Sequence, residues 1–557
     1  MRKLLLAVSC SVLAACSGAP VRVEAPYAPG GRLGVRTADA AGPELRKDLG
    51  VPEDLPGQLV LAVMSGSPAA DCAIEAGDFL ALIDGAPFAE LSQLKAKGAG
   101  AKVVFEARRE GSSRTLSCTL GGFPAALGLM ATPGAGGLKL EGAPKDSALE
   151  AAMRSMRWPP NPVFIETLDG RKVASIDEVK AALAGRRPGE TVLVGLRSYY
   201  SKKKPQVPIT LKDGEGLETP PLDKPAARAP KTLVVAQDGS GDFRTPLGAL
   251  LRSVPGDTLL LRAGRYAEPL EVRMPERTLR GEGEKTVLTG GLFIRDARGT
   301  VVEDLTVERA IAAPKTVPSA ADRTGGRSSR IAAQRRAPTA GNPSLETVGL
   351  IVRGADGTVL RRVQATGGQP GIAVEASREV VLEDCRARLA GIGFLLHDGA
   401  EAKVLRAVSH ENNDGLVVAG DSTAGLRALT LADNRARGLV VEAGRAELYD
   451  SILAGSPTLL LCQDGCRLSG GYNDYFEGNL CSGGGRGALS CAAASEGGKD
   501  VGLKKESDLS VDPLFAERLK GDYRLSLESP LIGRGRGGGH IGALAPVGSG
   551  AGGEGFR

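Results

Sequence analysis

Apolar residues recur at a fixed interval along the C-terminal half of this chain. Five apolar runs, GLIV, GIAV, GFLL, GLVV and GLVV, begin at Gly349, Gly371, Gly393, Gly415 and Gly438, at spacings of 22, 22, 22 and 23 residues. A second apolar series, at Leu360, Leu382, Val404, Leu426 and Leu448, repeats every 22 residues. A period of this length, with two or more short strands per repeat and no helical pattern, predicts a parallel β-solenoid whose turns share one continuous core.

Strand alternation divides the side chains of each run into two sets. The first and third residues after each glycine are apolar and should point into the core. The fourth should point outward, which gives the vertical series Arg353, Glu375, His397, Ala419 and Glu442, with neighbours about 4.8 Å apart. The second should also point outward, yet Ile351, Ala373, Leu395, Val417 and Val440 are all apolar. Such a stripe needs a cover, which could be a loop, a neighbouring domain or a flat ligand such as a sugar ring.

Charged residues interrupt the inward pattern of the second strand. Two residues after each member of the second apolar series lie Arg362, Asp384, Arg406, Ala428 and Asp450, where strict alternation would bury them. Buried unpaired charge is costly, so we expect a bend that turns these side chains outward, with opposite charges on adjacent rungs offsetting one another. After such a bend Cys385 points inward, between Val363 and Ala407, as a small buried hydrophobic residue.

Residues 31–122 read as a small β-rich module with one or two helices. Its motifs, LGV at 33–35, GSPA at 66–69 and GDFLALIDG at 77–85, resemble a PDZ domain of the bacterial, protease-associated kind. The resemblance implies that Leu33, Gly34 and Val35 form the loop that takes the carboxylate of a peptide, which adds to the module as an extra strand.

Residues 123–213 resemble the same family more loosely, through FIETLDGRKV at 164–173 and PGETVLVGLR at 188–197. The Gly-Asp pair before the central strand is missing, which argues against peptide binding by this copy. A spacer role stands beside peptide binding as an alternative for both copies. PDZ modules of this kind usually accompany a serine protease, which needs Ser, His and Asp together. All three histidines, at 397, 410 and 540, lie in the other half of the chain, which argues against proteolysis.

The N-terminal segment MRKLLLAVSCSVLAAC joins two basic residues to a short apolar run, which predicts a signal peptide over residues 1–15. LAAC resembles a bacterial lipobox, which implies cleavage before Cys16 and lipidation of its thiol; an ordinary signal peptide is the alternative. Ser17, and not Asp, follows this cysteine, which resembles the sequence of lipoproteins sorted to the outer membrane more than that of lipoproteins retained in the inner membrane. We therefore expect an outer-membrane lipoprotein of the bacterial cell envelope, periplasmic or surface-exposed, with a tether over 16–30 and the membrane as a partner through its lipid.

Composition narrows the partners. The 557 residues include 70 basic and 65 acidic ones, a balance that gives no reason to expect nucleic acid. Export permits disulfides, and the simplest pairs are Cys72/Cys118, Cys462/Cys466 and Cys481/Cys491. The last four cysteines could instead hold zinc, although their spacing matches no compact CxxC pair. We expect no cofactor and no metal.

A Pro-rich, charged linker over 214–231 leads to the stretch QDGSGDFRT, whose Gly and Asp residues suit a tight turn and lack the context of a phosphate loop. DGSGDF at 238–243 and the GxYxE pattern at 264–268 resemble the start of pectin lyase-like β-helix proteins, most closely pectinesterases, and residues 511–535 resemble their closing segment. The resemblance implies a right-handed parallel β-helix (solenoid) over 232–545, with a basic insertion at 312–346 and a Gly-rich tail at 546–557. The fold class is therefore mainly β, with one or two small PDZ-like α+β domains before the β-helix.

Two functions remain open. In the first, the protein is an envelope scaffold that binds peptides through its PDZ modules and a glycan or protein on the β-helix face. In the second, the β-helix acts on a polysaccharide as a lyase, epimerase, esterase or hydrolase; β-elimination by a lyase requires a base and a cation that neutralises the substrate carboxylate. The candidates are His397 with Arg353 and Glu375 on the outward series, and His410, Glu411 and Asp414 in the HENNDG turn. The pectinesterase Arg-Pro-Trp and Gln-Asp-Thr segments are absent from the sequence, so no complete catalytic set can be named and binding is favoured.

Overall fold

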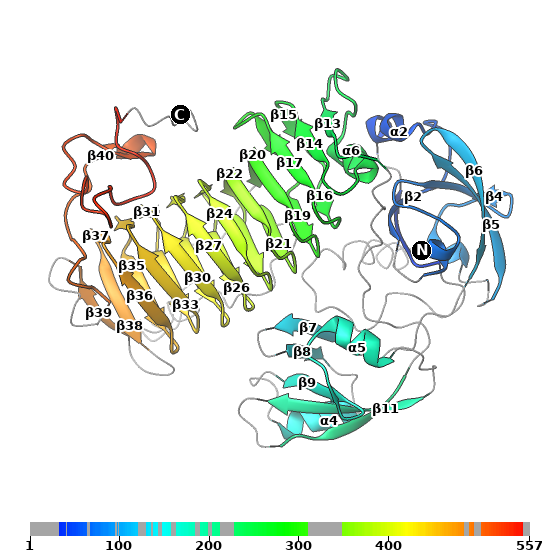
Figure 1. The fold of residues 1–557 in the computed structure, drawn as a ribbon, viewed down its shortest axis with the longest axis horizontal. Coiled ribbons are helices and arrows are strands. Elements are labelled where there is room, and N and C mark those ends of the chain that lie inside the picture. The colour runs from blue at the N-terminus through cyan, green and yellow to red at the C-terminus, as the bar shows by residue number, and fades with distance from the viewer. Residues whose placement is uncertain are drawn as a thin grey trace, which may run out of the picture.

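A computed structural model describes residues 33–39, 42–63, 67–94, 97, 100–120, 130–134, 137–142, 148–156, 163–183, 190–198, 203–211, 228–309, 348–483, 489–494 and 503–549. The predicted signal peptide with Cys16, the tether and the basic insertion lie outside these residues. The fold is mainly β: two small β-rich modules precede a parallel β-solenoid of about ten turns (Figure 1).

The first module is a mixed α+β unit around one antiparallel sheet. Its elements are β1 (Val35–Asp39), α2 (Pro43–Leu49), β2 (Gln58–Val63), α3 (Pro68–Asp71), β3 (Phe79–Ile83), β4 (Ala86–Pro87), η1 (Leu91–Leu94), β5 (Lys102–Arg109) and β6 (Ser112–Thr119). The strand order is β1-β2-β3-β5-β6, with β4 paired to β3, so β1 lies at one edge.

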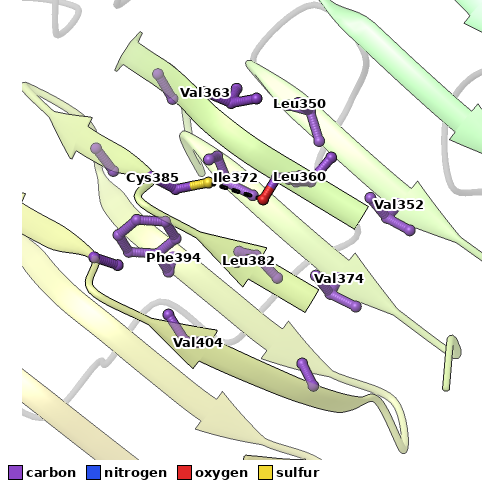
Figure 2. Packing of buried hydrophobic residues seen from close by; sticks show 14 of the residues in the cluster. Leu350, Val352, Leu360, Val363, Ile372, Val374, Leu382, Cys385, Phe394 and Val404 are labelled. Atoms are coloured by element: carbon purple, nitrogen blue, oxygen red, sulfur yellow. Dashed lines mark hydrogen bonds between the residues drawn. The ribbon is translucent and has the colours of Figure 1, made fainter. Parts of the chain in front are cut away.

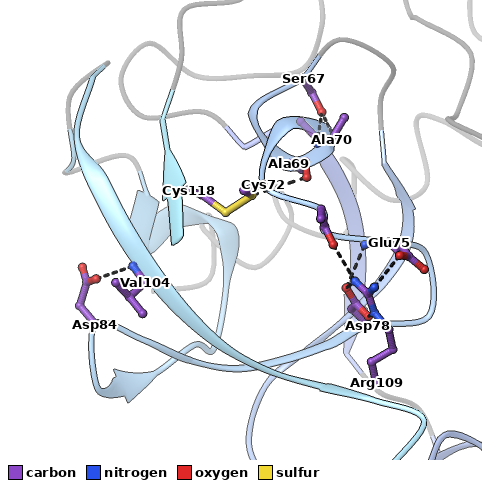
Figure 3. Close-up of a disulfide and its surroundings, with 12 residues drawn as sticks. Ser67, Ala69, Ala70, Cys72, Glu75, Asp78, Asp84, Val104, Arg109 and Cys118 are labelled. Carbon is purple, nitrogen blue, oxygen red and sulfur yellow. Dashed lines mark hydrogen bonds and ion pairs between the residues drawn. A yellow bond between two sulfur atoms is a disulfide. The ribbon is translucent and has the colours of Figure 1, made fainter. Parts of the chain in front are cut away.

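A disulfide and a group of ion pairs hold this module together (Figure 3). A disulfide joins Cys72, directly after α3, to Cys118 of β6. Arg109 of β5 binds both oxygens of the buried Asp78 at 2.6 and 2.7 Å and also reaches Glu75 at 2.5 Å. The Gly-Asp pair that the sequence motif contains is thus a structural element, because Asp78 fixes the turn before β3.

The second module repeats this plan without that buried aspartate. It comprises β7 (Met130–Gly134), β8 (Gly137–Gly142), α4 (Ala148–Ser155), β9 (Val163–Leu168), β10 (Arg171–Lys172), α5 (Ile176–Leu183), β11 (Thr191–Ser198) and β12 (Gln206–Thr210). The strands follow the order β12-β11-β9-β8-β7 around a separate apolar core.

The β-helix opens with β13 (Thr232–Val235) and α6 (Pro246–Arg252) and continues as two sheets. The larger one, here called the bent sheet, consists of β13, β14 (Thr258–Leu261), β15 (Gly264–Tyr266), β17 (Thr278–Gly281), β18 (Thr286–Leu288), β20 (Val301–Arg309), β22 (Val359–Gly367), β24 (Val380–Glu383), β25 (Arg386–Arg388), β27 (Glu401–Leu405), β28 (Val408–His410), β30 (Thr423–Arg427), β31 (Thr430–Ala432), β33 (Arg445–Tyr449), β34 (Ile452–Ala454), β36 (Arg467–Gly471) and β37 (Asp474–Phe476). The second sheet consists of β16 (Leu270–Val272), β19 (Leu292–Arg295), β21 (Leu350–Arg353), β23 (Ile372–Glu375), β26 (Ile392–His397), β29 (Asp414–Ala419), β32 (Arg437–Glu442), β35 (Thr458–Gln463), β38 (Asn479–Gly483) and β39 (Ser490–Ala493).

The predicted inward residues form the core between these sheets (Figure 2). Leu350, Val352, Ile372 and Val374 are at most 1% exposed, and parallel pairing places Leu350 beside Ile372. Cys385 is a free, fully buried cysteine in the same cluster. The inward pattern read from the repeat is therefore confirmed.

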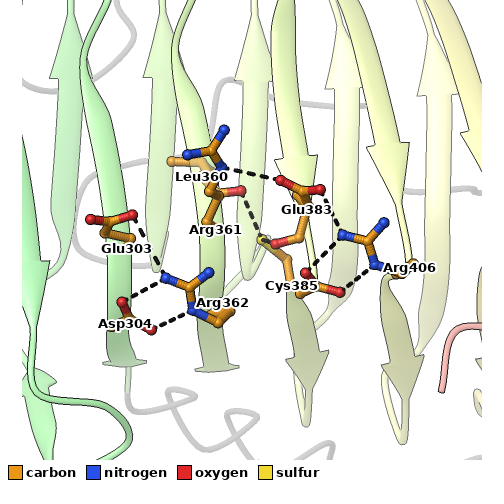
Figure 4. Close-up of polar contacts among 9 residues, drawn as sticks. Glu303, Asp304, Leu360, Arg361, Arg362, Glu383, Cys385 and Arg406 are labelled. Atoms are coloured by element: carbon orange, nitrogen blue, oxygen red, sulfur yellow. Dashed lines mark hydrogen bonds and ion pairs between the residues drawn. The ribbon is translucent and has the colours of Figure 1, made fainter. Parts of the chain in front are cut away.

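The predicted bend lies in the bent sheet, between two strands on most turns and within the single strand β22 at Arg362. Arg362, Asp384, Arg406, Ala428 and Asp450 all have left-handed backbones, with φ between 49° and 55°. Their charges pair between rungs: Arg362 binds Asp304 at 2.5 and 2.7 Å, and Arg406 binds Asp384 at 2.7 and 2.9 Å (Figure 4). Opposite charges on adjacent rungs offset one another, as the sequence predicted.

The first module is fixed to the start of the β-helix through α2. Asp48 accepts hydrogen bonds from the backbone N–H groups of Arg244 and Thr245, each at 2.8 Å, and from the Thr245 hydroxyl at 2.6 Å. Thr245 is the N-cap of α6, so Asp48 also places a negative charge at the positive end of that helix. Apolar side chains of α2, β3 and α6 form one buried cluster around this contact. The end of the QDGSGDFRT stretch is thus a docking point between domains.

The C-terminal segment closes the other end. Its hairpin consists of β40 (Phe515–Glu517) and β41 (Asp522–Leu525), joined by η4 (Arg518–Lys520). It packs Tyr523 and Leu525 on outward apolar residues of β28, β31 and β34. Disulfides join Cys462 to Cys466 and Cys481 to Cys491. Together with Cys72–Cys118 these are the three expected pairs, and the zinc alternative for the last four cysteines is wrong because each sulfur is bonded to another.

Replacing Asp48 with alanine should loosen the first module. The variant leaves three donors at the start of α6 without their charged acceptor, so we expect the free energy of unfolding to fall by about 1–3 kcal/mol. Thermal unfolding and hydrogen exchange of α6 measure the effect. Asp54→Ala, at an exposed position of the same module, is the control; equal behaviour of the two variants would contradict the docking role.

Candidate functional site

The outward series on the second sheet forms one connected set of charges. β21, β23 and β26 bring Arg353, Glu375 and His397 to adjacent rungs. Arg353 forms an ion pair with Glu375, and Nε2 of His397 lies 2.8 Å from Oε1 of Glu375. The other ring nitrogen of His397 lies 3.2 Å from Oδ2 of Asp398. The three residues proposed from the sequence therefore meet, and Asp398 joins them.

The set holds His397 in its charged form. Burial disfavours the imidazolium, but hydrogen bonds to Asp398 and Glu375 outweigh burial and raise the pKa of His397 to about 9. Burial acts on Glu375 in the opposite sense, yet His397 and Arg353 lower the pKa of this carboxyl below its usual value. At neutral pH the imidazolium lies between two carboxylates, so neither ring nitrogen has a free lone pair with which to accept a proton as a general base.

The apolar stripe beside these charges is covered by the chain itself. Ile351, Ala373, Leu395, Val417 and Val440 are between 0 and 8% exposed. Burial raises the pKa of Asp398, but the hydrogen bond and charge of His397, followed by the charges of Lys139 of β8 and of Arg353, lower it below its usual value. The charge of Lys139 therefore reaches this part of the sheet from the second module. Of the three possible covers that the sequence left open, the apolar stripe is therefore covered by protein, and it is not exposed for stacking against a sugar ring.

The second group of candidates does not assemble into one site. His410 ends β28 beneath the C-terminal hairpin, with its ring 5.0 Å from that of Tyr523, and burial together with Arg388 and Arg386 lowers the pKa of His410 to about 4. Glu411 lies 3.6 Å from the His410 ring and is half-exposed. Asp414 belongs to the other sheet, where it is fully buried and Arg437 binds both of its oxygens at 2.6 Å.

Leu33, Gly34 and Val35 lead into the edge strand β1 of the first module. Leu33 and Val35 are buried in the module core, and Gly34 has a left-handed backbone with φ 76°. The Leu33 carbonyl accepts a hydrogen bond from the Ala69 N–H at 2.8 Å, which ties the loop to the start of α3. The loop is thus held at the point where β1 begins.

Neither a metal centre nor a membrane span is found in the part of the chain that the structure describes. No three His, Cys, Asp or Glu side chains gather there in a way that could hold a metal ion. No described helix is long and apolar enough to cross a membrane.

Comparison with known proteins gives structural likeness only. No protein-family model and no curated protein matches the chain. Among solved structures, the pectate lyase Pel9A is similar with a TM-score of 0.35 and 10% identity over 58% of this chain and 98% of its own. The A-module of the mannuronan C-5 epimerase AlgE4 from Azotobacter vinelandii is similar with a TM-score of 0.27 and 15% identity over 40% of this chain and 70% of its own.

A shorter part of the chain has a different neighbour. The HtrA-type protease AlgW, solved with a decapeptide, is 28% identical with a TM-score of 0.15 over 16% of this chain. The match spans 29% of the protease chain, so the chain covers under a third of that protein's length.

Three residues with roles in these contacts were not among the sequence candidates. Asp398 directly follows His397, and its left-handed backbone, with φ 56°, turns it toward the ring. Arg437 lies one rung beyond Asp414, a relation that the repeat period could have shown. Asp48 is 197 residues from Thr245, and no local signal connects the two.

An NMR titration of the histidines tests the charged state of His397. Its imidazole should stay protonated up to pH about 9, while that of His410 stays neutral down to about 4. The folded-state pKa of His397 lies above the usual 6.5, so its stabilising effect is complete below pH 6.5 and is lost as the pH rises to about 9. His397→Gln should remove this dependence, which amounts to at most about 3 kcal/mol. A His397 that titrates near 6.5 would show that the ion-pair set does not form.

Removing Arg437 tests the buried pair with Asp414. Arg437→Ala leaves a fully buried carboxylate without its counter-ion, so we expect a loss of about 3–5 kcal/mol in urea unfolding. Arg435→Ala, at an exposed position two residues earlier, should change stability by less than about 0.5 kcal/mol. Adding Asp414→Asn to Arg437→Ala should recover part of the loss because it removes the charge; no recovery would contradict this electrostatic explanation.

Proposed function

We propose that this protein binds ligands at the bacterial cell envelope and does not catalyse a reaction. In this proposal a lipid on Cys16 anchors the chain to the outer membrane, and the β-helix is a rigid support. The first module takes the end of an extended peptide, and the outer surface of the β-helix carries a glycan. The observation that supports this most directly is the position of β1, an edge strand on a module that is fixed to the β-helix.

The peptide site of the proposal is the edge of β1 that pairs with no described strand. Strand addition uses the main-chain N–H and C=O groups of an edge strand. Among the described strands β1 pairs with β2 alone, and the left-handed Gly34 directly precedes it. Because Asp48 fixes the module to α6, a peptide held at β1 keeps one orientation relative to the β-helix.

The charges on the second sheet favour binding over catalysis. A polysaccharide lyase or epimerase needs a group that removes a proton, and a hydrolase needs a positioned acid and base. His397 is already protonated between Glu375 and Asp398, and His410 lies beneath the C-terminal hairpin. The two histidines that the sequence offered as bases are therefore occupied in structural contacts.

Substitution of Gly34 tests the peptide site. Gly34→Ala puts a side chain on a left-handed residue and should distort the loop before β1, so the affinity of the full chain for C-terminal peptides should fall at least about tenfold. Binding to a library of peptides with free C-termini is measured by fluorescence anisotropy, and the selected sequence is then used with both variants.

Gly85→Ala is a matched control in the same module. Gly85 also has a left-handed backbone, with φ 81°, and no atom lies within 4 Å of the added Cβ. It sits in the hairpin after β3, away from β1, so its affinity should stay within about twofold of the unmodified protein. Absence of binding to every peptide, or equal losses in both variants, would refute a peptide site at β1.

A further inference from the structure

The outer surface of the bent sheet ends in a distinct patch, here called the C-terminal face. It consists of the outward residues of β27, β30, β33 and β36, which stack in three columns. The columns are Glu401, Thr423, Arg445 and Arg467; Lys403, Gly425, Glu447 and Ser469; and Leu405, Arg427, Tyr449 and Gly471. The residues between them point inward; Ala446 and Leu448, for example, are at most 1% exposed. Alternation therefore directs the three columns outward.

On the preceding rungs the outward charges neutralise one another. Arg280 pairs with Glu303 at 2.5 Å, and Arg361 pairs with Glu383 at 3.1 Å. The bend residues beside them pair in the same way (Figure 4). This part of the surface therefore offers an anionic ligand little net attraction.

On the C-terminal face this balance is lost. Its columns contain four basic residues and two acidic ones. Arg427 binds Asp450 at 3.3 Å, but the exposed side chains of Arg445 and Arg467 make no ion pair or hydrogen bond with any described residue. These two arginines are register partners on adjacent rungs, about 4.8 Å apart. Like charges in this position destabilise a sheet, so the pair is better explained by a ligand than by stability.

Two tyrosines lie toward the far end of the same two strands, four residues from Arg445 and five residues from Arg467, which is roughly 13–17 Å at the rise of an extended strand. Tyr449 is half-buried, and the guanidinium of Arg536 lies 5.2 Å from the centre of its ring. Tyr472 follows β36 at the bend position, is 40% exposed and has φ 61°. The bend is left-handed on the earlier rungs as well, where it carries Arg, Asp or Ala. What distinguishes this rung is therefore the aromatic ring that the bend turns toward solvent.

We infer that the C-terminal face binds an anionic glycan, with its carboxylates on Arg445 and Arg467 and a sugar ring against Tyr472. Guanidinium groups bind carboxylates through two parallel hydrogen bonds, and the apolar face of a sugar ring can pack on an aromatic ring. Thr423, Gly425 and Ser469 keep the surface low between the charged side chains, which leaves room for an extended chain. This inference rests on the proposed function, because it names the face and the ligand class of the glycan-binding part.

Binding of the full chain to polygalacturonate and to neutral dextran tests the inference. At about 0.15 M salt, polygalacturonate should bind and dextran should not. Arg445→Ala with Arg467→Ala should weaken polygalacturonate binding at least about tenfold, because two charge-assisted contacts are lost. Tyr472→Ala should weaken it about threefold or more, and Tyr472→Phe should restore it, since the ring and not the hydroxyl makes the contact. All these positions are exposed or half-exposed, so no variant should lower the thermal unfolding temperature, and the double arginine variant should raise it slightly because it relieves the repulsion between the two rungs.

Arg361→Ala with Arg362→Ala is the matched control. It removes the same charge from the same sheet, but from the rungs where the arginines are already paired, so binding should stay within about twofold. Equal losses in the two double variants, or binding unaffected by Arg445 and Arg467, would refute this site while leaving glycan binding elsewhere on the β-helix intact. Equal binding of dextran would refute the anionic class. Binding of neither polysaccharide would refute the inference together with the glycan part of the proposed function.

Discussion

The β-helix depends on one constraint of backbone geometry: each turn lies directly on the one before, so a residue always meets its counterpart one repeat away. The left-handed residue at every bend makes this stacking possible, and such residues carry a conformational cost. Buried polar side chains one rung on satisfy the backbone at the corners. The Ala390 N–H donates to Oδ1 of Asn412 at 2.9 Å, and the Asn412 N–H donates to Oδ1 of Asn434 at 3.2 Å, each across 22 residues. The corner therefore persists only where the next rung supplies an acceptor.

The same constraint decides what an outward charge does. A charged side chain on one rung faces the side chain of the next, so a ladder of alternating sign stabilises the sheet and a ladder of one sign does not. Arg362 with Asp304 and Arg406 with Asp384 are the first case. Glu375 between Arg353 and His397 is the same arrangement on the second sheet. Residues that look catalytic in the sequence, because they stack on one face, are thus drawn into ion pairs by that stacking.

Much of this fold could be read from the sequence because the β-helix is nearly one-dimensional. The repeat at Gly349, Gly371 and Gly393 predicted the inward residues, the bend and the place of Cys385, since each of these depends only on the neighbouring turn. The outcome for the candidate site was different. The meeting of Arg353, Glu375 and His397 followed from the register, but the charge state of His397 depends on Asp398 and on burial beneath another part of the chain. Contacts between domains, such as Asp48 with Thr245, have no period and left no signal in the sequence.

The sequence motifs at the start of the β-helix also take part in the contact with the first module, since Arg244 and Thr245, which follow DGSGDF, donate hydrogen bonds to Asp48. The DGSGDF and GxYxE motifs close the start of the β-helix, and Glu268 of the second motif lies near Asp48 at the domain contact. Burial, together with the charge of Asp48, raises the pKa of Glu268 above its usual value. A carboxyl group with a raised folded-state pKa stabilises the folded contact when protonated, and this stabilisation is lost as the pH rises through its folded-state pKa. At neutral pH Glu268 therefore opposes the contact that Asp48 makes with α6, and the apolar cluster of α2, β3 and α6 must outweigh it. The placement of the first module on the β-helix thus rests on apolar burial together with the hydrogen bonds of Asp48.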